Sequence, residues 1–137
     1  MNGKEFENVA HLPPEKRYEY FIKKVADREE VWCLWNDGWA LMGGNDHEEM
    51  DPVWPHAMFA EASAVGEWLG FKPKKITLDE WMDKWIPSME RDGRMTAVFP
   101  TAQGTTTTAS PFKLRSDLEE EIAKYEYALP SAPPFVF

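Results

Sequence analysis

Residues 31–44 read VWCLWNDGWALMGG, in which strand-forming residues flank an Asn-Asp-Gly break. Asp-Gly is a strong signal for a two-residue hairpin turn, because glycine tolerates the positive φ that a type I′ turn requires. The stretch therefore predicts a β-hairpin over residues 31–42. In that register one face of the hairpin carries four large apolar side chains: Trp32, Leu34, Trp39 and Leu41.

Both faces of the predicted hairpin are apolar. Trp35, Cys33 and Met42 lie on the face opposite Trp39. A strand pair with one face in water alternates apolar and polar residues, so we expect this hairpin to be covered on both sides. Cys33 is the only cysteine, which excludes an intrachain disulfide, and its apolar neighbours predict a buried thiol.

Two helices are predicted around the hairpin. Apolar residues recur at helical spacing after a Pro-Pro pair, and this stripe consists of Tyr18, Phe21, Ile22 and Val25. After the acidic loop 45–51, Pro55 suits the first turn of a second helix and Gly70 suits its end. The predicted buried stripe of this second helix is Met58, Ala62, Val65 and Leu69.

A third helix is predicted from its start signal. Thr77 and Glu80 form a capping box, in which each side chain accepts a hydrogen bond from the backbone N–H of the other residue. Pro87 lacks an N–H and clashes with the carbonyl four residues earlier. We therefore expect this helix to bend or end near Ile86.

The remaining segments indicate the fold class. MTAVF at residues 95–99 predicts a buried strand, and residues 104–109 predict either its partner strand or a mobile edge. Ser110 and Pro111 are suited to cap and begin a last helix. Because no regular βαβ repeat is present, we expect a single α+β domain over residues 1–128, with a small, mostly antiparallel sheet packed against about four helices.

Charge and motifs restrict the function. The formal net charge is -9, which repels phosphate backbones and anionic membranes but attracts a basic protein partner. We find no nucleophile elbow, phosphate loop or dinucleotide fingerprint, so no cofactor or catalytic residue is expected. No apolar run approaches the roughly 18 residues of a membrane span, and the first residues lack a secretory signal. We expect a cytoplasmic protein that binds neither nucleic acid nor membrane.

Several segments, taken in order, resemble one family. They are Trp32 and the Gly-Trp-Ala of the hairpin, Trp54-Pro55, the segment from Trp81 to Pro87, and the Phe-Pro-Thr of residues 99–101. In these the chain resembles the bacterial family catalogued as domain of unknown function 2750, over most of its length from Arg17 to Tyr125. The resemblance implies a small intracellular α+β domain and brings no reaction or catalytic residues with it.

Five residues are candidates for binding. Asp46 and His47 could supply ligands to a divalent cation, but a solvated acidic loop is the simpler explanation, and we assign no metal. His56 at a helix start could bind a carboxylate or phosphate, or could simply be a partly exposed residue. Trp35 and Trp54 are the best candidates for exposed indoles, because we assign the tryptophans at 32, 39, 81 and 85 to a shared core.

Two functional hypotheses follow. The first is a non-catalytic protein-interaction module, which binds its partner through an aromatic patch near Trp54 and the acidic loop 43–51. The alternative is a small-molecule-binding protein or an enzyme, whose pocket would be lined by Trp35, Trp54 and His56.

The C-terminal residues 129–137 read LPSAPPFVF and form a tail of their own. Three prolines exclude a regular helix, yet the segment ends in Phe-Val-Phe, where an unstructured end is normally polar. We expect this tail to dock in an extended conformation, either along its own domain or across a symmetric partner in a homodimer.

Overall fold

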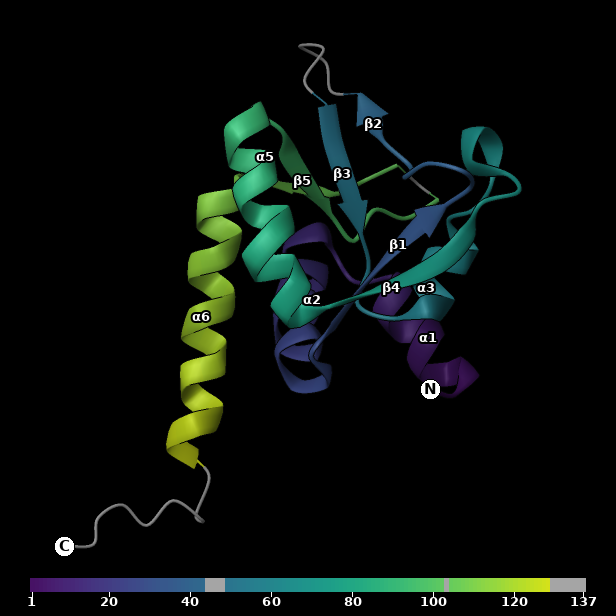
Figure 1. Cartoon of the computed structure of the whole chain (residues 1–137). Coiled ribbons are helices and arrows are strands. Elements are labelled where there is room, and N and C mark those ends of the chain that lie inside the picture. Colours follow the sequence, from purple (N-terminus) through teal and green to yellow (C-terminus); the bar gives the residue numbers. More distant parts are fainter. Residues whose placement is uncertain (44–48, 103, 129–137) are drawn as a thin grey trace, which may run out of the picture.

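The computed structural model describes residues 1–43, 49–102 and 104–128, and over these ranges the chain forms an α+β domain with two small sheets (Figure 1). Its helical segments are α1 (Gly3–Ala10), α2 (Pro14–Arg28), α3 (Ala57–Ala62), a 3₁₀ turn (Gly66–Trp68), α4 (Leu78–Glu80), a π-helical turn (Trp81–Trp85), α5 (Ile86–Asp92) and α6 (Pro111–Ala128). Its strands are β1 (Glu30–Trp35), β2 (Met42–Gly43), β3 (Glu49–Val53), β4 (Lys72–Thr77), β5 (Met95–Val98) and β6 (Thr107–Ala109). Among the described helices, none qualifies as a transmembrane span.

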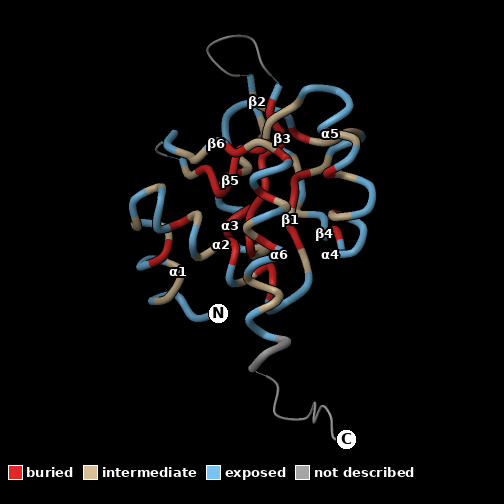
Figure 2. The backbone as a smooth tube through the Cα atoms, turned by 90° about the vertical axis from the view of Figure 1, so that its left-hand side faces the viewer, coloured by how far each residue is buried: buried red, intermediate tan, exposed pale blue. Residues whose placement is uncertain are grey.

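The two sheets share one core. One sheet pairs β1 with β4, and the other has the order β2-β3-β5-β6, in which only β3 and β5 are parallel. Trp32 of β1 and Trp54, just beyond β3, join the sheets through two backbone hydrogen bonds of 2.9 and 2.8 Å. Buried residues concentrate in β1, β3 and β5 (Figure 2), while α6 packs along α2 and α5 (Figure 1). The expectation of a single α+β domain is confirmed.

The hairpin prediction requires a correction. The chain does reverse at residues 36–38, but β1 forms its ladder with β4, whose sequence KPKKIT carries little strand signal. The returning arm makes only an isolated bridge between Trp35 and Trp39, so these two indoles share a side and are not on opposite faces. The reason is the turn: Asn36 N–H donates to the Gly38 carbonyl at 2.9 Å, which gives a three-residue bend. A shift of one residue in register moves a side chain to the other face.

The second predicted helix is much shorter than expected. α3 ends at Ala62, and the predicted stripe is wrong, because Met58, Val65 and Leu69 are exposed. Phe59 is buried instead, at 4.7 Å from the ring centroid of Phe99. Aromatic packing therefore determines which face of this short helix lies against the core.

The helix that contains Pro87 continues through the proline instead of ending. In the π-helical turn, Ile86 N–H bonds to the Trp81 carbonyl five residues earlier, and the next π-type donor would be the absent N–H of Pro87. That missing donor would leave the Met82 carbonyl unpaired. The guanidinium of Arg115 on α6 replaces it, donating from Nη2 to the Met82 carbonyl at 2.8 Å.

Other local predictions are confirmed. One half of the predicted capping box forms, because Thr77 Oγ1 accepts the Glu80 N–H at 3.2 Å, but no bond from the Thr77 N–H to the Glu80 carboxylate occurs in the described structure. Ser110 Oγ accepts the N–H of a first-turn residue of α6 at 3.1 Å. Residues 95–98 and 107–109 form the predicted strand pair. Cys33 is buried, and burial raises the pKa of its thiol. The tail prediction for residues 129–137 lies outside the described residues.

Candidate functional site

The residues singled out from the sequence do not converge. Trp54 is completely buried, so the expectation that it is exposed is wrong. Its Nε1 donates a hydrogen bond of 2.9 Å to the buried Pro100 carbonyl. An indole is stable in a core when its single polar atom finds such a partner. Asp46 and His47 lie outside the described residues.

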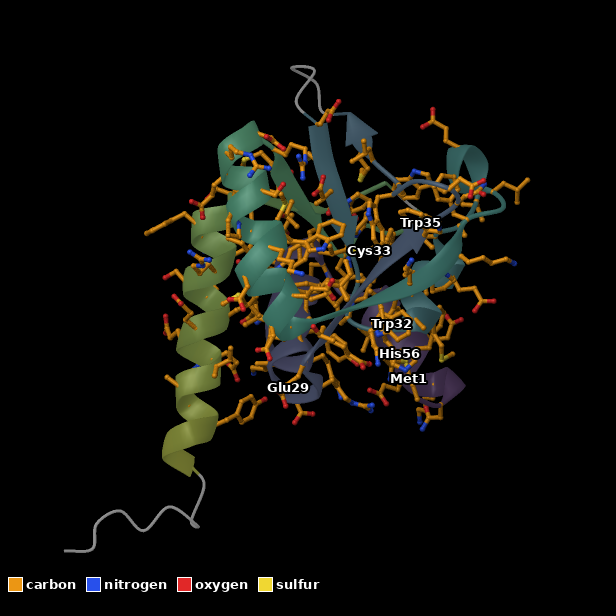
Figure 3. The ribbon with its side chains drawn as sticks, viewed as in Figure 1. Met1, Glu29, Trp32, Cys33, Trp35 and His56 are labelled. Atoms are coloured by element: carbon orange, nitrogen blue, oxygen red, sulfur yellow. The ribbon has the colours of Figure 1, made fainter. Side chains whose placement is uncertain are left out.

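His56 lies near Trp32 and Met1 and away from Trp35 (Figure 3). It precedes α3 as its N-cap, and its Nδ1 accepts the Met58 N–H at 3.0 Å. Burial lowers the pKa of the His56 imidazole, and the N-terminal amine and Arg28 lower it further. His56 lines a cavity of about 80 Å³ together with Arg28 and Tyr20. Neither Trp35 nor Trp54 lines this cavity, so His56 does not share a site with the two candidate tryptophans.

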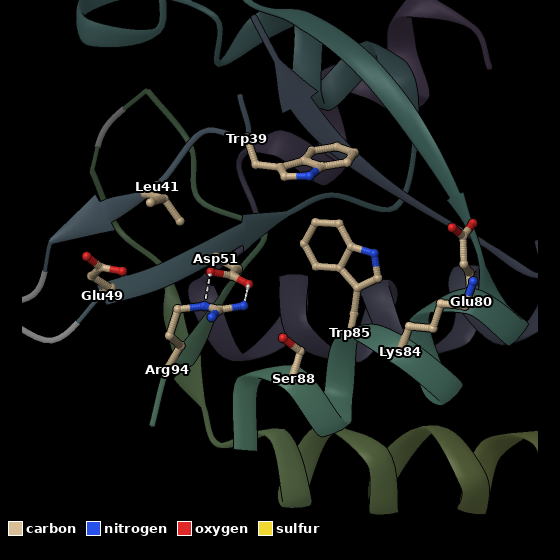
Figure 4. A pocket seen from close by; sticks show the side chains of 9 residues that line it. All are labelled: Trp39, Leu41, Glu49, Asp51, Glu80, Lys84, Trp85, Ser88 and Arg94. Atoms are coloured by element: carbon tan, nitrogen blue, oxygen red, sulfur yellow. Dashed lines mark hydrogen bonds and ion pairs between the residues drawn. The ribbon is translucent and has the colours of Figure 1, made fainter. Parts of the chain in front are cut away.

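A much larger groove lies between residues 39–41, β3 and the helical segment of residues 78–92 (Figure 4). Its volume is about 610 Å³. Its lining consists of Trp39, Leu41, Glu49, Asp51, Glu80, Lys84, Trp85, Ser88 and Arg94. The π-helical turn supplies part of one wall, and such turns are frequent at functional sites. We call this hollow the Trp39–Trp85 groove.

Four indoles pack in a row beside the groove, and two of them, Trp39 and Trp85, form its aromatic wall. The ring centroids of Trp35 and Trp39 are 4.7 Å apart, and those of Trp39 and Trp85 are 4.8 Å apart, both edge-to-face. Trp81 stacks on Trp85 at 5.5 Å and is completely buried. Because Trp81 covers one face of Trp85 and does not line the groove, the other face of Trp85 is the open one (Figure 4).

An ion-pair network fixes the other wall. Arg94 donates from Nε and Nη2 to the two carboxylate oxygens of Asp51 at 3.1 and 3.3 Å, and from Nη1 to Asp92 at 2.7 Å. The Asp51 side chain is only 5% exposed. Burial raises the pKa of this carboxyl, and the Arg94 guanidinium opposes the shift. Because Arg94 is held by two carboxylates, it is not a free cation.

Three charged groups of the groove remain unpaired. Glu49 and Glu80 are exposed and form no ion pair within the described part of the chain, and the same holds for Lys84. Neither histidine nor cysteine is among the described residues that line the groove, and the hydroxyl of Ser88 accepts a hydrogen bond from Arg91. Elsewhere in the described ranges, no cluster of three or more potential metal ligands occurs. Indole faces beside free carboxylates suit the binding of a cationic or mixed apolar group.

Sequence reasoning missed most of this groove. The sequence predicts Trp39 and Trp85 to be part of the core, but both are only partly buried. The sequence signal for this wall of the groove is that Trp81 and Trp85 lie one helical turn apart just before a proline. Nothing local points to Arg94, because its partner Asp51 is 43 positions away.

Comparison with known proteins adds the family. Neither curated proteins nor solved structures provide a match. The family described as protein of unknown function (DUF2750) matches residues 18–118, which include every residue that lines the Trp39–Trp85 groove. Since the match covers well over half of the 137 residues, the chain belongs to the DUF2750 family.

Proposed function

We propose that this protein is a non-catalytic interaction module, and that it docks a basic protein partner in the Trp39–Trp85 groove. The observation that carries the proposal is an open groove in which partly exposed indoles lie beside Leu41, whose side chain is 47% exposed. Aromatic side chains in such hollows dominate the energetics of many interfaces. The docking surface therefore lies away from Trp54, but it includes Glu49 at the edge of the acidic loop.

Electrostatics supports a basic partner. The protein carries a net charge of -9, and among the described residues of the groove two carboxylates without an ion pair, Glu49 and Glu80, outnumber one such ammonium, Lys84. Complementary charge speeds encounter, and screening by salt weakens it. Binding should therefore be strongest at low ionic strength.

The test is a comparison of two matched variants. Leu41 lines the groove, whereas Leu69, which is 76% exposed, does not. Leu41→Lys and Leu69→Lys change the net charge equally, but only the first places a cation in the groove. We expect wild type and Leu69→Lys to capture the same protein from a host lysate at low salt, and Leu41→Lys to lose it. Equal capture by both variants would overturn the proposal.

A small-molecule-binding protein or enzyme is the second candidate, and the volume of the groove favours it. About 610 Å³ lies within the range of roughly 300 to 1,000 Å³ that is typical of ligand pockets. A metabolite screen by thermal shift would test it. Hits that persist in Leu69→Lys and vanish in Leu41→Lys would support this candidate, and a screen without such hits would argue against it.

Location and assembly complete the proposal. A cytoplasmic location fits a chain whose single cysteine, Cys33, is buried and unpaired. A homodimer through residues 129–137 fits the apolar composition of that tail.

A further inference from the structure

We propose that the Trp39–Trp85 groove recognises an arginine side chain of the partner protein, with its guanidinium over the open face of Trp85. This inference rests on the proposed function and names the chemical group that the groove accepts. It depends on three features of the groove: the aromatic wall, the unpaired carboxylates and the exposed Leu41.

The indole row already holds a cation of the chain itself. Nζ of Lys74 lies 4.5 Å from the ring centroid of Trp35 and 5.6 Å from that of Trp39. These distances fall within the range of cation–π attraction. No described cation lies over Trp85, although one face of its ring is open to the groove. The next ring of the same row is therefore available to a cation from outside.

The carboxylates select the kind of cation. Glu49 and Glu80 lie at opposite ends of the groove, with Trp85 between them (Figure 4). Asp51 is occupied by Arg94, so within the described ranges Glu49 and Glu80 are the carboxylates of the groove that have no ion pair. A guanidinium can place its flat face on an indole while its edge donates two hydrogen bonds to a carboxylate. An ammonium can also lie over an indole and donate to a carboxylate, but it has neither the flat face that stacks on the ring nor the two-pronged edge that makes a bidentate bond.

The exposed leucine fits the rest of the side chain. Leu41 lines the groove beside the indoles and is 47% exposed. The three methylene groups of arginine form an apolar stem that covers such a surface while the charged end remains near water. An arginine in a partner chain thus matches the apolar, aromatic and anionic parts of the groove together.

The experiment uses the full chain and two blocked peptides, Gly-Gly-Arg-Gly-Gly and its citrulline counterpart. Citrulline has nearly the shape of arginine but no charge. Binding is followed by NMR of the indole N–H of Trp85 and Trp39 during titration. We expect the arginine peptide to bind about tenfold more tightly than the citrulline peptide, with a lysine peptide between them. Added salt should reduce the difference.

Variants locate the acceptors. Glu49→Gln combined with Glu80→Gln should bring the affinity for the arginine peptide close to that for the citrulline peptide. Glu67→Gln removes an exposed carboxylate that does not line this groove, and it should leave the tenfold difference intact.

Three results would overturn the arginine assignment: no shift of the Trp85 signal with the arginine peptide, equal binding of the citrulline peptide, or no effect of the double variant. If lysate capture still depends on Leu41 in such a case, the interaction module stands and only the arginine is excluded. If the peptide binds selectively but capture ignores Leu41, the arginine site stands and the proposed docking of a partner protein fails.

Discussion

Two buried tryptophans differ in one hydrogen bond, and this difference predicts their tolerance to phenylalanine. Trp54 and Trp81 are both completely buried. Trp54 Nε1 donates to the Pro100 carbonyl at 2.9 Å, whereas Trp81 Nε1 is a buried donor that has no partner in the described structure. The perturbation is Trp54→Phe in one variant and Trp81→Phe in the other.

The two substitutions share most of their cost. Each replaces an indole by a benzene ring in the core, so the lost apolar contacts and the residual cavity are similar and largely cancel in the comparison. Trp54→Phe also removes a hydrogen bond and leaves the Pro100 carbonyl with only Ser63 Oγ at 3.4 Å. Trp81→Phe removes a polar atom that was desolvated without compensation. An unsatisfied buried group costs about 1 to 3 kcal/mol, so Trp54→Phe should be the more destabilising by about 2 kcal/mol.

Urea and thermal unfolding of both variants measure this difference. At an unfolding entropy of about 2.1 cal/mol/K per residue, about 2 kcal/mol in a chain of 137 residues corresponds to about 7 °C between the two melting temperatures. Unchanged urea m-values would show that both variants unfold like the wild type. Equal losses of stability, or a larger loss for Trp81→Phe, would refute the reasoning.

Three further predictions concern the helix with the proline, one tyrosine and the tail. Arg115→Met should lower the free energy of unfolding by about 1 to 3 kcal/mol, because it leaves the Met82 carbonyl unpaired. The loss should be smaller in a Pro87→Ala background, where residue 87 regains its N–H. Strict additivity of the two substitutions in a urea double-mutant cycle would contradict this. Burial raises the pKa of Tyr20 from 10.0 to about 12, and so do its hydrogen bond with Glu5 and the negative charge of Glu5. The contribution of Tyr20 to stability is therefore present below pH 10 and is lost as the pH rises toward 12. Tyr20→Phe should reduce this pH dependence of unfolding, and the tyrosinate absorbance that it removes should titrate near pH 12; a removed component centred near pH 10 would argue against it. Deleting residues 131–137 should lower either the mass of the assembly measured by light scattering or the melting temperature. The reason is that burial of Phe or Val contributes roughly 1.5 to 3 kcal/mol per side chain before ordering costs. No change in either the oligomeric state or the melting temperature would exclude docking of the tail.

The sequence by itself determined the elements whose signals are local. The cap at Thr77 and the cap at Ser110 form as predicted, because donor and acceptor are three residues apart. The stripe of α2 is also confirmed in part, with Phe21, Ile22 and Val25 buried. Such contacts depend only on helical periodicity and on side chains that reach their own backbone.

Only the tertiary structure decided the groove. A strand pattern does not specify its partner, and β1 pairs with β4 instead of with the segment that follows the Asp-Gly turn. One additional residue in that turn places Trp35 beside Trp39, and Arg115 from a distant helix donates to the Met82 carbonyl in the segment that carries Trp85. The Asp51–Arg94 pair likewise joins residues 43 positions apart. The physical reason is that local preferences are weak beside burial and pairing in the folded core, so contacts between distant segments determine which indoles stay exposed.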